Sequence, residues 1–180
     1  MEQIGHFMKK ITDEFGLTCG LTDMEDKIFR PELKEACKSN VCGNYGVCHT
    51  CPPRVGRVDE LIGKVSACKQ IIVFQKVYEI EDSYDYEGMM TGQQDFKQAL
   101  QKIAAYAKEC FTGPRILGVG GCGICERCAA RDETPCRFPE RAISSLEAHA
   151  IHVAVLSEKV GMKYINGENT VTYFGGVFLK

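Results

Sequence analysis

Apolar residues recur every three or four positions in several stretches of the chain, which is the spacing of one buried helix face. This spacing predicts helices over residues 1–16, 57–68 and about 93–111. The apolar face of the first helix consists of Ile4, Phe7, Met8, Ile11 and Phe15. A further short helix is expected to end at Cys37, because Pro31 suits a first helical turn.

β-Branched and aromatic residues predict the strands. The run KQIIVFQKVYEI, residues 69–80, carries the strongest strand signal. Residues 16–24, 114–121 and 169–180 are shorter or glycine-interrupted candidates. Strands that alternate with helices predict an α/β or α+β fold, in which a small sheet is flanked by helices within a single compact domain of residues 1–180.

A last long helix is expected from Ser144 to Gly161. Ser144 and Glu147 have the spacing of a capping box, and glycine is common just past a helix end. On such a helix His149 and His152 would lie near one face. A polar helix edge, or hydrogen-bond donors to a metal site, explains the pair better than a metal-binding pair does.

The chain contains 11 cysteines and has a net charge of −2. The N-terminal stretch has no apolar core of signal-peptide length, and no segment approaches the roughly 18 apolar residues of a membrane span. We therefore expect a cytoplasmic protein, in which thiols stay reduced and clustered cysteines bind metal rather than form disulfides. The balanced charge predicts no nucleic-acid partner and no membrane partner.

Eight of the cysteines lie in two loops, of which the second, residues 120–139, is the more informative. Cys122, Cys125 and Cys128 follow the spacing C-x2-C-x2-C, and Cys136 follows after seven intervening residues. Two-residue gaps let successive thiolates bind neighbouring corners of a four-iron, four-sulfur cube, as in bacterial ferredoxins. Glycines around Cys122 suit a backbone that approaches a cluster closely. This loop therefore predicts an iron–sulfur site.

The first cysteine loop, residues 37–53, has a different spacing, C-x4-C-x5-C-x2-C-P. Its cysteines are Cys37, Cys42, Cys48 and Cys51. With the second loop they supply the eight thiolates that two [4Fe–4S] clusters would take. The sequence leaves open whether each loop holds its own cluster, because a cluster can take a ligand from the other loop and Cys48 or His49 can stand free.

Zinc is the alternative metal. A four-cysteine zinc site pairs two C-x2-C units, and Cys48/Cys51 with Cys125/Cys128 would provide them. That arrangement uses only half of the clustered cysteines and leaves the C-x2-C-x2-C triplet unexplained, so iron–sulfur is favoured.

Four motifs in this order, CGNYG, CPP, CGICERC…PCRFP and SSLEAHAI, resemble a prokaryotic family of predicted cysteine-rich metal-binding proteins of unknown function. The resemblance spans most of the chain, from the first cysteine loop to the last strand. It implies metal binding and no established reaction. The ligands that it implies are Cys37, Cys42, Cys51, Cys122, Cys125, Cys128 and Cys136. At the position of Cys48 the family pattern is not dependably cysteine.

The function depends on whether Cys48 is a metal ligand or a free thiol. If Cys48 is a ligand, two closed clusters would transfer electrons to a redox partner protein. The acidic stretch 79–87 is most simply a solvated loop, and would otherwise dock a basic partner. If Cys48 is free, a cluster held by three cysteines would expose one iron to a small substrate, and the protein would be an enzyme.

The neighbours of Cys48 are weaker candidates for that chemistry. His49 is expected to be a loop hydrogen-bonding residue and Arg54 a surface charge, with Tyr45 beside them. A third function, an iron–sulfur scaffold or metal carrier, would need a labile cluster. The sequence contains no P-loop, G-x-S-x-G or H-E-x-x-H motif. It specifies neither the substrate nor the oligomeric state, and a homo-oligomer stays open.

Overall fold

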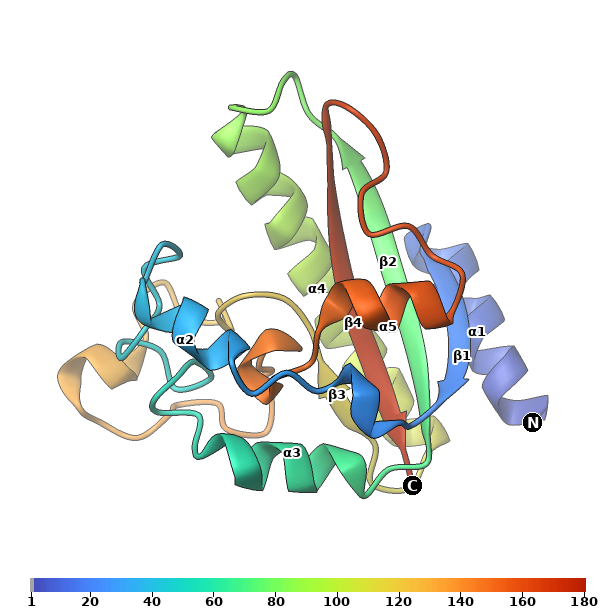
Figure 1. Ribbon diagram of the computed structural model, residues 1–180, viewed down its shortest axis with the longest axis horizontal. Coiled ribbons are helices and arrows are strands. Elements are labelled where there is room, and N and C mark those ends of the chain that lie inside the picture. The colour runs from blue at the N-terminus through green and yellow to red at the C-terminus, as the bar shows by residue number, and fades with distance from the viewer. Residues whose placement is uncertain (1) are drawn as a thin grey trace.

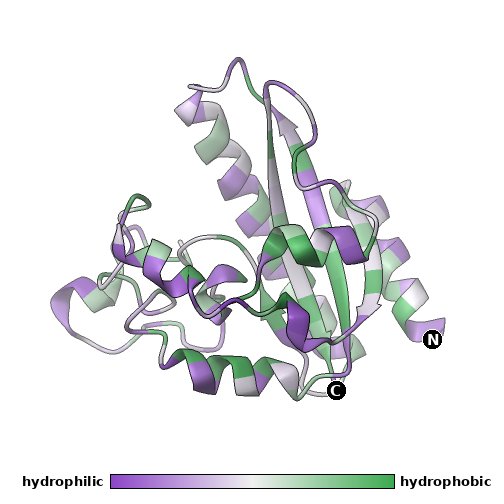
Figure 2. Cartoon of the chain, viewed as in Figure 1, coloured by the Kyte–Doolittle hydropathy of each residue, from purple (hydrophilic) through white to green (hydrophobic). Residues whose placement is uncertain are grey.

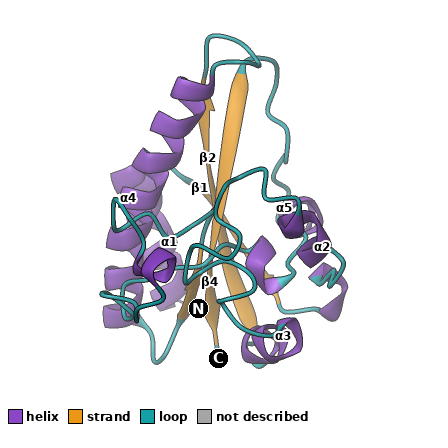
Figure 3. Ribbon diagram, turned by 90° about the vertical axis from the view of Figure 1, so that its left-hand side faces the viewer, coloured by secondary structure: helices purple, strands orange, loops and turns teal. Residues whose placement is uncertain are grey.

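A four-stranded antiparallel sheet separates two groups of helices in the computed structural model, which describes residues 2–180 (Figure 1 and Figure 3). The strands, in their spatial order, are β1 (Thr18–Asp23), β2 (Gln70–Glu79), β4 (Thr170–Leu179) and β3 (Arg115–Leu117). One face carries α1 (Glu2–Phe15) and α4 (Tyr86–Cys110), and the other faces α2 (Leu33–Lys38), α3 (Val58–Ser66) and α5 (Val153–Lys159). The predicted small sheet flanked by helices is confirmed.

The apolar run of β2 is explained by burial on both faces of the sheet. Ile71 and Val73 face the core on the α3 and α5 side, whereas Ile72 and Phe74 face the core on the α1 and α4 side. Successive residues of a strand point to opposite faces, so a strand covered on both sides needs apolar residues at every position. β2 occupies this place because β1 and β4 both pair with it.

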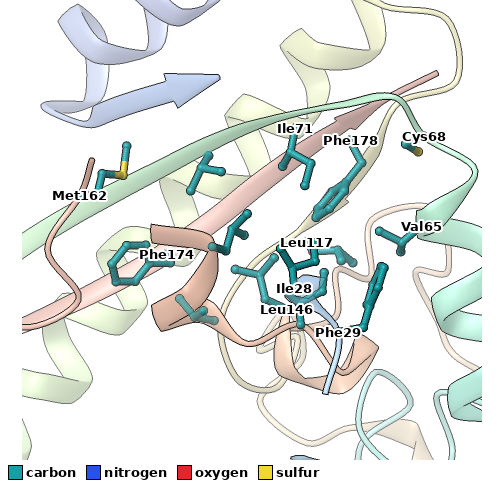
Figure 4. Packing of buried hydrophobic residues seen from close by; sticks show 14 residues of the cluster. Ile28, Phe29, Val65, Cys68, Ile71, Leu117, Leu146, Met162, Phe174 and Phe178 are labelled. Atoms are coloured by element: carbon teal, nitrogen blue, oxygen red, sulfur yellow. The ribbon is translucent and has the colours of Figure 1, made fainter. Parts of the chain in front are cut away.

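Two hydrophobic clusters hold the layers together. Phe174 and Phe178 of β4 pack with Val65 of α3 on one face (Figure 4). On the other face Phe7 of α1 packs with Leu100 of α4. Hydrophobic colouring gathers on the strands and on the helix sides next to them (Figure 2). No residue of either cysteine loop belongs to these two clusters of buried residues.

Helix α4 starts at Tyr86, so the predicted start near residue 93 is wrong. The Asp85 carboxylate accepts a hydrogen bond from the Gly88 N–H at 2.7 Å and caps the helix. Gly88 and Gly92 weaken the helical signal in this turn, because glycine disfavours helix interiors. Gly92 is nevertheless required by packing, since a Cβ there would lie 2.9 Å from the ring of Tyr78.

The predicted helix from Ser144 to Gly161 is also wrong. It is broken into a 3-10 turn, η3 (Glu147–His149), and α5, with Ala150 between them in the left-handed region at φ 58°. The break lets the segment form hydrogen bonds to another part of the chain. The backbone N–H of Arg30 donates to the Ala150 carbonyl at 2.6 Å, and the backbone N–H of His152 donates to the Ile28 carbonyl at 2.8 Å. The serine that caps this turn is Ser145 rather than the predicted Ser144, since the Ser145 hydroxyl accepts a hydrogen bond from the Ala148 N–H.

The two cysteine loops lie side by side at the β3 edge of the sheet (Figure 1). The second loop leaves the end of β3, and the first connects α2 to α3. Within residues 2–180 no helix has the length and hydropathy needed to cross a membrane.

Candidate metal centre

The first cysteine loop contributes thiols of very different exposure. Cys37 is half-buried in the last turn of α2, and Cys42 is exposed in the turn that follows. Cys48 and Cys51 are buried, with exposed fractions of 5% and 8%. The Cys51 N–H donates to the Cys48 carbonyl at 3.1 Å, so a single turn holds these two cysteines next to each other.

The thiols of Cys48 and Cys51 interact directly. The hydrogen bond from Cys51 is the largest cause that lowers the pKa of the Cys48 thiol to about 4, and burial opposes it. The Thr50 hydroxyl and the backbone N–H of Cys122 lower it further. The same hydrogen bond, with burial, raises the pKa of Cys51. Cys48 therefore carries the negative charge of the pair, and a thiolate is the form that binds metal.

The second cysteine loop surrounds a small pocket. Cys122, Cys125, Cys128 and Cys136 are each half-buried and line it together. Cys48 of the first loop lines the same pocket, so five cysteines from both loops surround a space of about 30 Å³. The structure therefore brings Cys48 to the second loop.

Three contacts join the two loops. The Cys122 N–H donates to the Thr50 hydroxyl at 3.1 Å. The His49 ring nitrogen Nε2 lies 2.8 Å from the Thr134 carbonyl, to which it donates. At Gly121 a Cβ would lie 2.8 Å from the Asn44 side-chain oxygen, so only glycine allows the loops to approach so closely.

The remaining thiols of the first loop form a second group. Burial raises the pKa of the Cys37 thiol, and negative charge on Cys42 and Glu147 raises it further. Charge on Cys42 also raises the pKa of Cys51. Cys42 therefore lies near both Cys37 and Cys51. Cys48 lies where this group meets the second loop.

The donor set fits a thiophilic metal, although the side chains do not converge. Among the residues described, no three His, Cys, Asp or Glu side chains are arranged as a ready set of metal ligands. Around the pocket the potential ligands are five cysteines and His49, whose Nε2 is taken up by the Thr134 carbonyl, and such a thiol-rich set selects zinc, copper(I) or iron–sulfur clusters. The sequence-predicted cysteines are therefore gathered, and binding would require their side chains to turn toward a common point.

Lys97 is a charged neighbour of both loops that the sequence did not indicate. Burial lowers the pKa of its ammonium, whereas charge on Cys122, Cys48 and other nearby thiols raises it. Its Nζ donates to the Gln93 side chain at 2.8 Å, and a Cβ at Gly123 would lie 3.5 Å from it. Lys97 stands on α4 beside Phe96 of the core, and no spacing pattern marks it as functional.

The three cysteines outside the loops pack in or against the two hydrophobic cores. Cys68 is buried in the α3 and α5 core. Cys19 and Cys110 pack against the other core, and Thr12 donates to the Cys19 sulfur at 3.3 Å. Burial raises the pKa of Cys19 and Cys68, which keeps both as thiols.

The histidines and Arg54 mostly serve the backbone. His49 is the predicted loop hydrogen-bonding residue, and Arg54 is exposed and donates to the Gly46 carbonyl at 2.6 Å. The expected common face of His149 and His152 does not exist, because the helix is broken between them. His152 caps α5 by accepting the Val155 N–H, whereas His149 is buried.

The fold and the gathered thiols define a cysteine-rich protein in which a helix-flanked antiparallel sheet carries a metal-binding centre. The chain belongs to the DUF2284 family of predicted metal-binding proteins, whose family model matches residues 21–179. The match includes both cysteine loops, all of β2, β3 and β4, and the last three residues of β1. No curated protein and no solved structure matches the chain.

Proposed function

We propose that this metal-binding protein holds two [4Fe–4S] clusters and acts in electron transfer in the cytoplasm. The observation that carries the proposal is the common pocket of Cys48 and the four cysteines of the second loop. One buried cysteine of the first loop and four half-buried cysteines of the second, lining one pocket, are suited to a polynuclear centre, whose ligands bind separate metal ions. Cys37, Cys42 and Cys51 provide a second group of ligands beside it.

The number and order of thiols favour iron–sulfur over zinc. Structural zinc takes four ligands around one ion, and the pocket alone gathers five thiols. The C-x2-C-x2-C triplet is typical of cubane clusters. When bound, each cluster would supply a one-electron redox couple. Lys97 would then offset part of the negative charge, and burial with backbone N–H groups would tune the potential.

A partner surface is available near the second loop. Gln93 of α4 lies beside Gly120 of the second loop. Along the helix, Gln93 is seven positions, or about 10 Å, from Tyr86. The connection before Tyr86 carries Glu81, Asp82 and an exposed Tyr84. This acidic end of α4 would steer a basic redox partner toward the cluster.

A second candidate function is an enzyme with an open iron. The position of Cys48 in the second-loop pocket favours it, because Cys37, Cys42 and Cys51 would then be the only thiols of the first site. A cluster held by three thiolates would leave one iron free to act as a Lewis acid toward a small substrate. A scaffold or carrier function would instead require clusters that a chelator removes quickly.

Anaerobic purification with iron, zinc and sulfide quantification tests the proposal, followed by EPR of the reduced protein. We expect about eight irons and eight sulfides per chain, as two cubes require. Zinc without sulfide would refute the proposal. Cys48→Ser then separates the two functions: loss of about four irons supports closed clusters, whereas unchanged iron supports the open-iron enzyme. Cys110→Ser, a half-buried cysteine outside both loops, is the matched control.

A further inference from the structure

A large groove lies outside the cysteine pocket. It is a groove of about 690 Å³ between α4, β3 and residues 140–144. Small-molecule sites typically occupy roughly 300–1,000 Å³ and combine apolar walls with a few polar groups. Ile116 and Leu117 of β3 provide the apolar wall here. The groove therefore has the dimensions of a metabolite site.

The polar lining of this groove is strongly basic. Its cationic side chains are Lys102, Lys108, Arg115 and Arg141. Glu140 is the single carboxylate among the lining residues. None of the four cations forms a salt bridge within the part of the chain that the structure describes. In a chain with a net charge of −2, this is a local excess of positive charge that the single carboxylate of Glu140 offsets only in part.

His149 adds a hydrogen-bond acceptor to the groove wall. Its side chain is 7% exposed, and Nδ1 lies 3.2 Å from the Ser145 carbonyl, which can only accept. The Ser144 hydroxyl, which can donate or accept, lies 3.4 Å from the same nitrogen. The tautomer that satisfies both contacts has its proton on Nδ1, and in neutral imidazole Nε2 is then an acceptor. Burial lowers the pKa of His149, and the charges of Arg115 and Lys64 lower it too, which favours the neutral form.

Nε2 of His149 has no hydrogen-bond partner among the residues that the structure describes. No hydrogen bond reaches this atom from residues 2–180, and it is not among the buried atoms that lack a partner. It is therefore open to the groove that His149 lines. An acceptor beside several cations fits a ligand that has both negative charge and a hydroxyl group.

We infer that this groove binds a small anion that carries a hydroxyl group, either a hydroxycarboxylate or a phosphate ester. The anionic groups would meet Arg141 and Arg115, whose guanidinium groups bind carboxylate and phosphate oxygens in pairs. The hydroxyl would donate to Nε2 of His149. The inference does not depend on which metal the cysteine loops hold.

The groove continues toward the metal centre. An adjoining groove of about 460 Å³ shares Gln101 and Arg141 with it and is lined by Lys97 and Cys122. Arg141 stands where the two grooves join. An anion at Arg141 is therefore placed between His149 and the second cysteine loop, and its binding can influence that loop.

Isothermal titration calorimetry at fixed ionic strength tests the inference on the purified protein. Two probe pairs separate the sources of charge, and each pair differs by one hydroxyl: malate against succinate, and propane-1,2-diol 1-phosphate against propyl phosphate. We expect one pair to bind with a Kd below about 1 mM. Its hydroxylated member should bind about three- to tenfold more tightly, the usual worth of one hydrogen bond.

Three variants assign the contacts. Arg141→Gln should weaken both members of the pair by about tenfold or more, because a charge-assisted bond is lost. His149→Asn keeps a donor for the Ser145 carbonyl but removes Nε2, so it should abolish the preference for the hydroxyl. Lys163→Gln, an exposed charge outside the groove, should change nothing.

The inference is overturned if neither pair binds below about 1 mM. It is also overturned if Lys163→Gln weakens binding as much as Arg141→Gln, or if His149→Asn retains the hydroxyl preference. Circular dichroism of each variant confirms that it is folded. Iron and sulfide are quantified on the same samples, so failure of the iron–sulfur proposal is recognised separately from failure of anion binding.

Discussion

The hydroxyl of Thr50 accepts a hydrogen bond from the backbone N–H of Cys122 at 3.1 Å, across 72 residues of sequence. The same hydroxyl lies 3.3 Å from the Cys48 sulfur. One buried threonine therefore touches both cysteine loops at the point where their thiols meet. Its role is to orient potential ligands, since it lies next to them and offers no thiolate of its own.

Thr50→Val should weaken metal retention while leaving the fold intact. Valine has nearly the same shape but cannot hydrogen-bond, so the Cys122 N–H and the Cys48 sulfur lose their partner. Loss of such a supporting contact typically costs 10–100-fold in metal affinity. Competition with a chelator, followed by metal analysis, measures the change. Thr112→Val, at an exposed position, is the control, and equal retention in both variants would contradict the assigned role.

Metal removal should loosen the cysteine loops without unfolding the sheet. Neither loop contributes to the two buried hydrophobic clusters that hold the helices on β2 and β4. The protein therefore differs from a zinc finger, which unfolds without its metal. After chelation we expect amide hydrogen exchange in residues 37–53 and 120–139 to accelerate by about tenfold or more.

The amides of β2 are the internal control for that experiment, because this strand is paired on both sides. Their exchange rates and the far-UV circular dichroism should stay nearly constant. Global loss of protection on chelation would show that the metal, rather than the apolar core, determines the fold.

The sequence predicts an element best where local pattern and tertiary packing agree. The buried positions of α1 are all apolar, and those of β2 are apolar except for Gln75, so their types and approximate bounds follow from the pattern. The segment from Ser144 to Gly161 fails for the opposite reason. Its helical pattern is real, but partners from residues 28–30 bond its backbone and break it at Ala150.

The thiols of the site could be predicted, but their grouping could not. Cysteine spacing identifies candidates within each loop. Whether Cys48 lies with Cys51 or with Cys122 depends on how two loops 70 residues apart pack, and on contacts such as that of Thr50. The roles of Lys97 and His149 could not be predicted either, because only the fold brings Lys97 close to the thiols and His149 to the basic groove.

Acid should destabilise the protein partly through Glu25. Hydrogen bonds from Lys159 and Lys27 lower the pKa of its carboxyl to about 2, against an ordinary 4.5. Because the folded-state pKa is depressed, the stabilisation is present above pH 4.5 and is lost as the pH falls toward 2. Glu25→Gln should therefore be less stable than the parent at neutral pH and approach it near pH 2.

Urea unfolding midpoints between about pH 7 and pH 2 measure this convergence. Added salt should reduce the difference, because Glu25 is exposed and its ion pairs are screened. Glu168→Gln, at an exposed position without an ion pair in residues 2–180, is the control. A constant difference at all pH values would refute the assignment to Glu25.

Gly175→Ala should destabilise the centre of the sheet. Gly175 of β4 stands opposite Phe74 of β2, whose ring lies over it. A Cβ at this position would be 2.5 Å from a ring carbon of Phe74 and 3.2 Å from the Leu117 carbonyl, so the fully buried ring would have to move. Overpacking of this kind costs about 1–3 kcal/mol.

Gly63→Ala is the matched control, and we expect it to raise the stability that Gly175→Ala lowers. Gly63 lies on the exposed side of α3, and a Cβ there would meet nothing within 4 Å. Alanine should stabilise the helix by about 0.5–1 kcal/mol, because it loses less backbone entropy on folding. Thermal unfolding resolves both changes, since 1 kcal/mol shifts Tm by about 2–4 °C in a chain of this size. If Gly175→Ala is as stable as the parent, the Phe74 ring does not pack against the glycine.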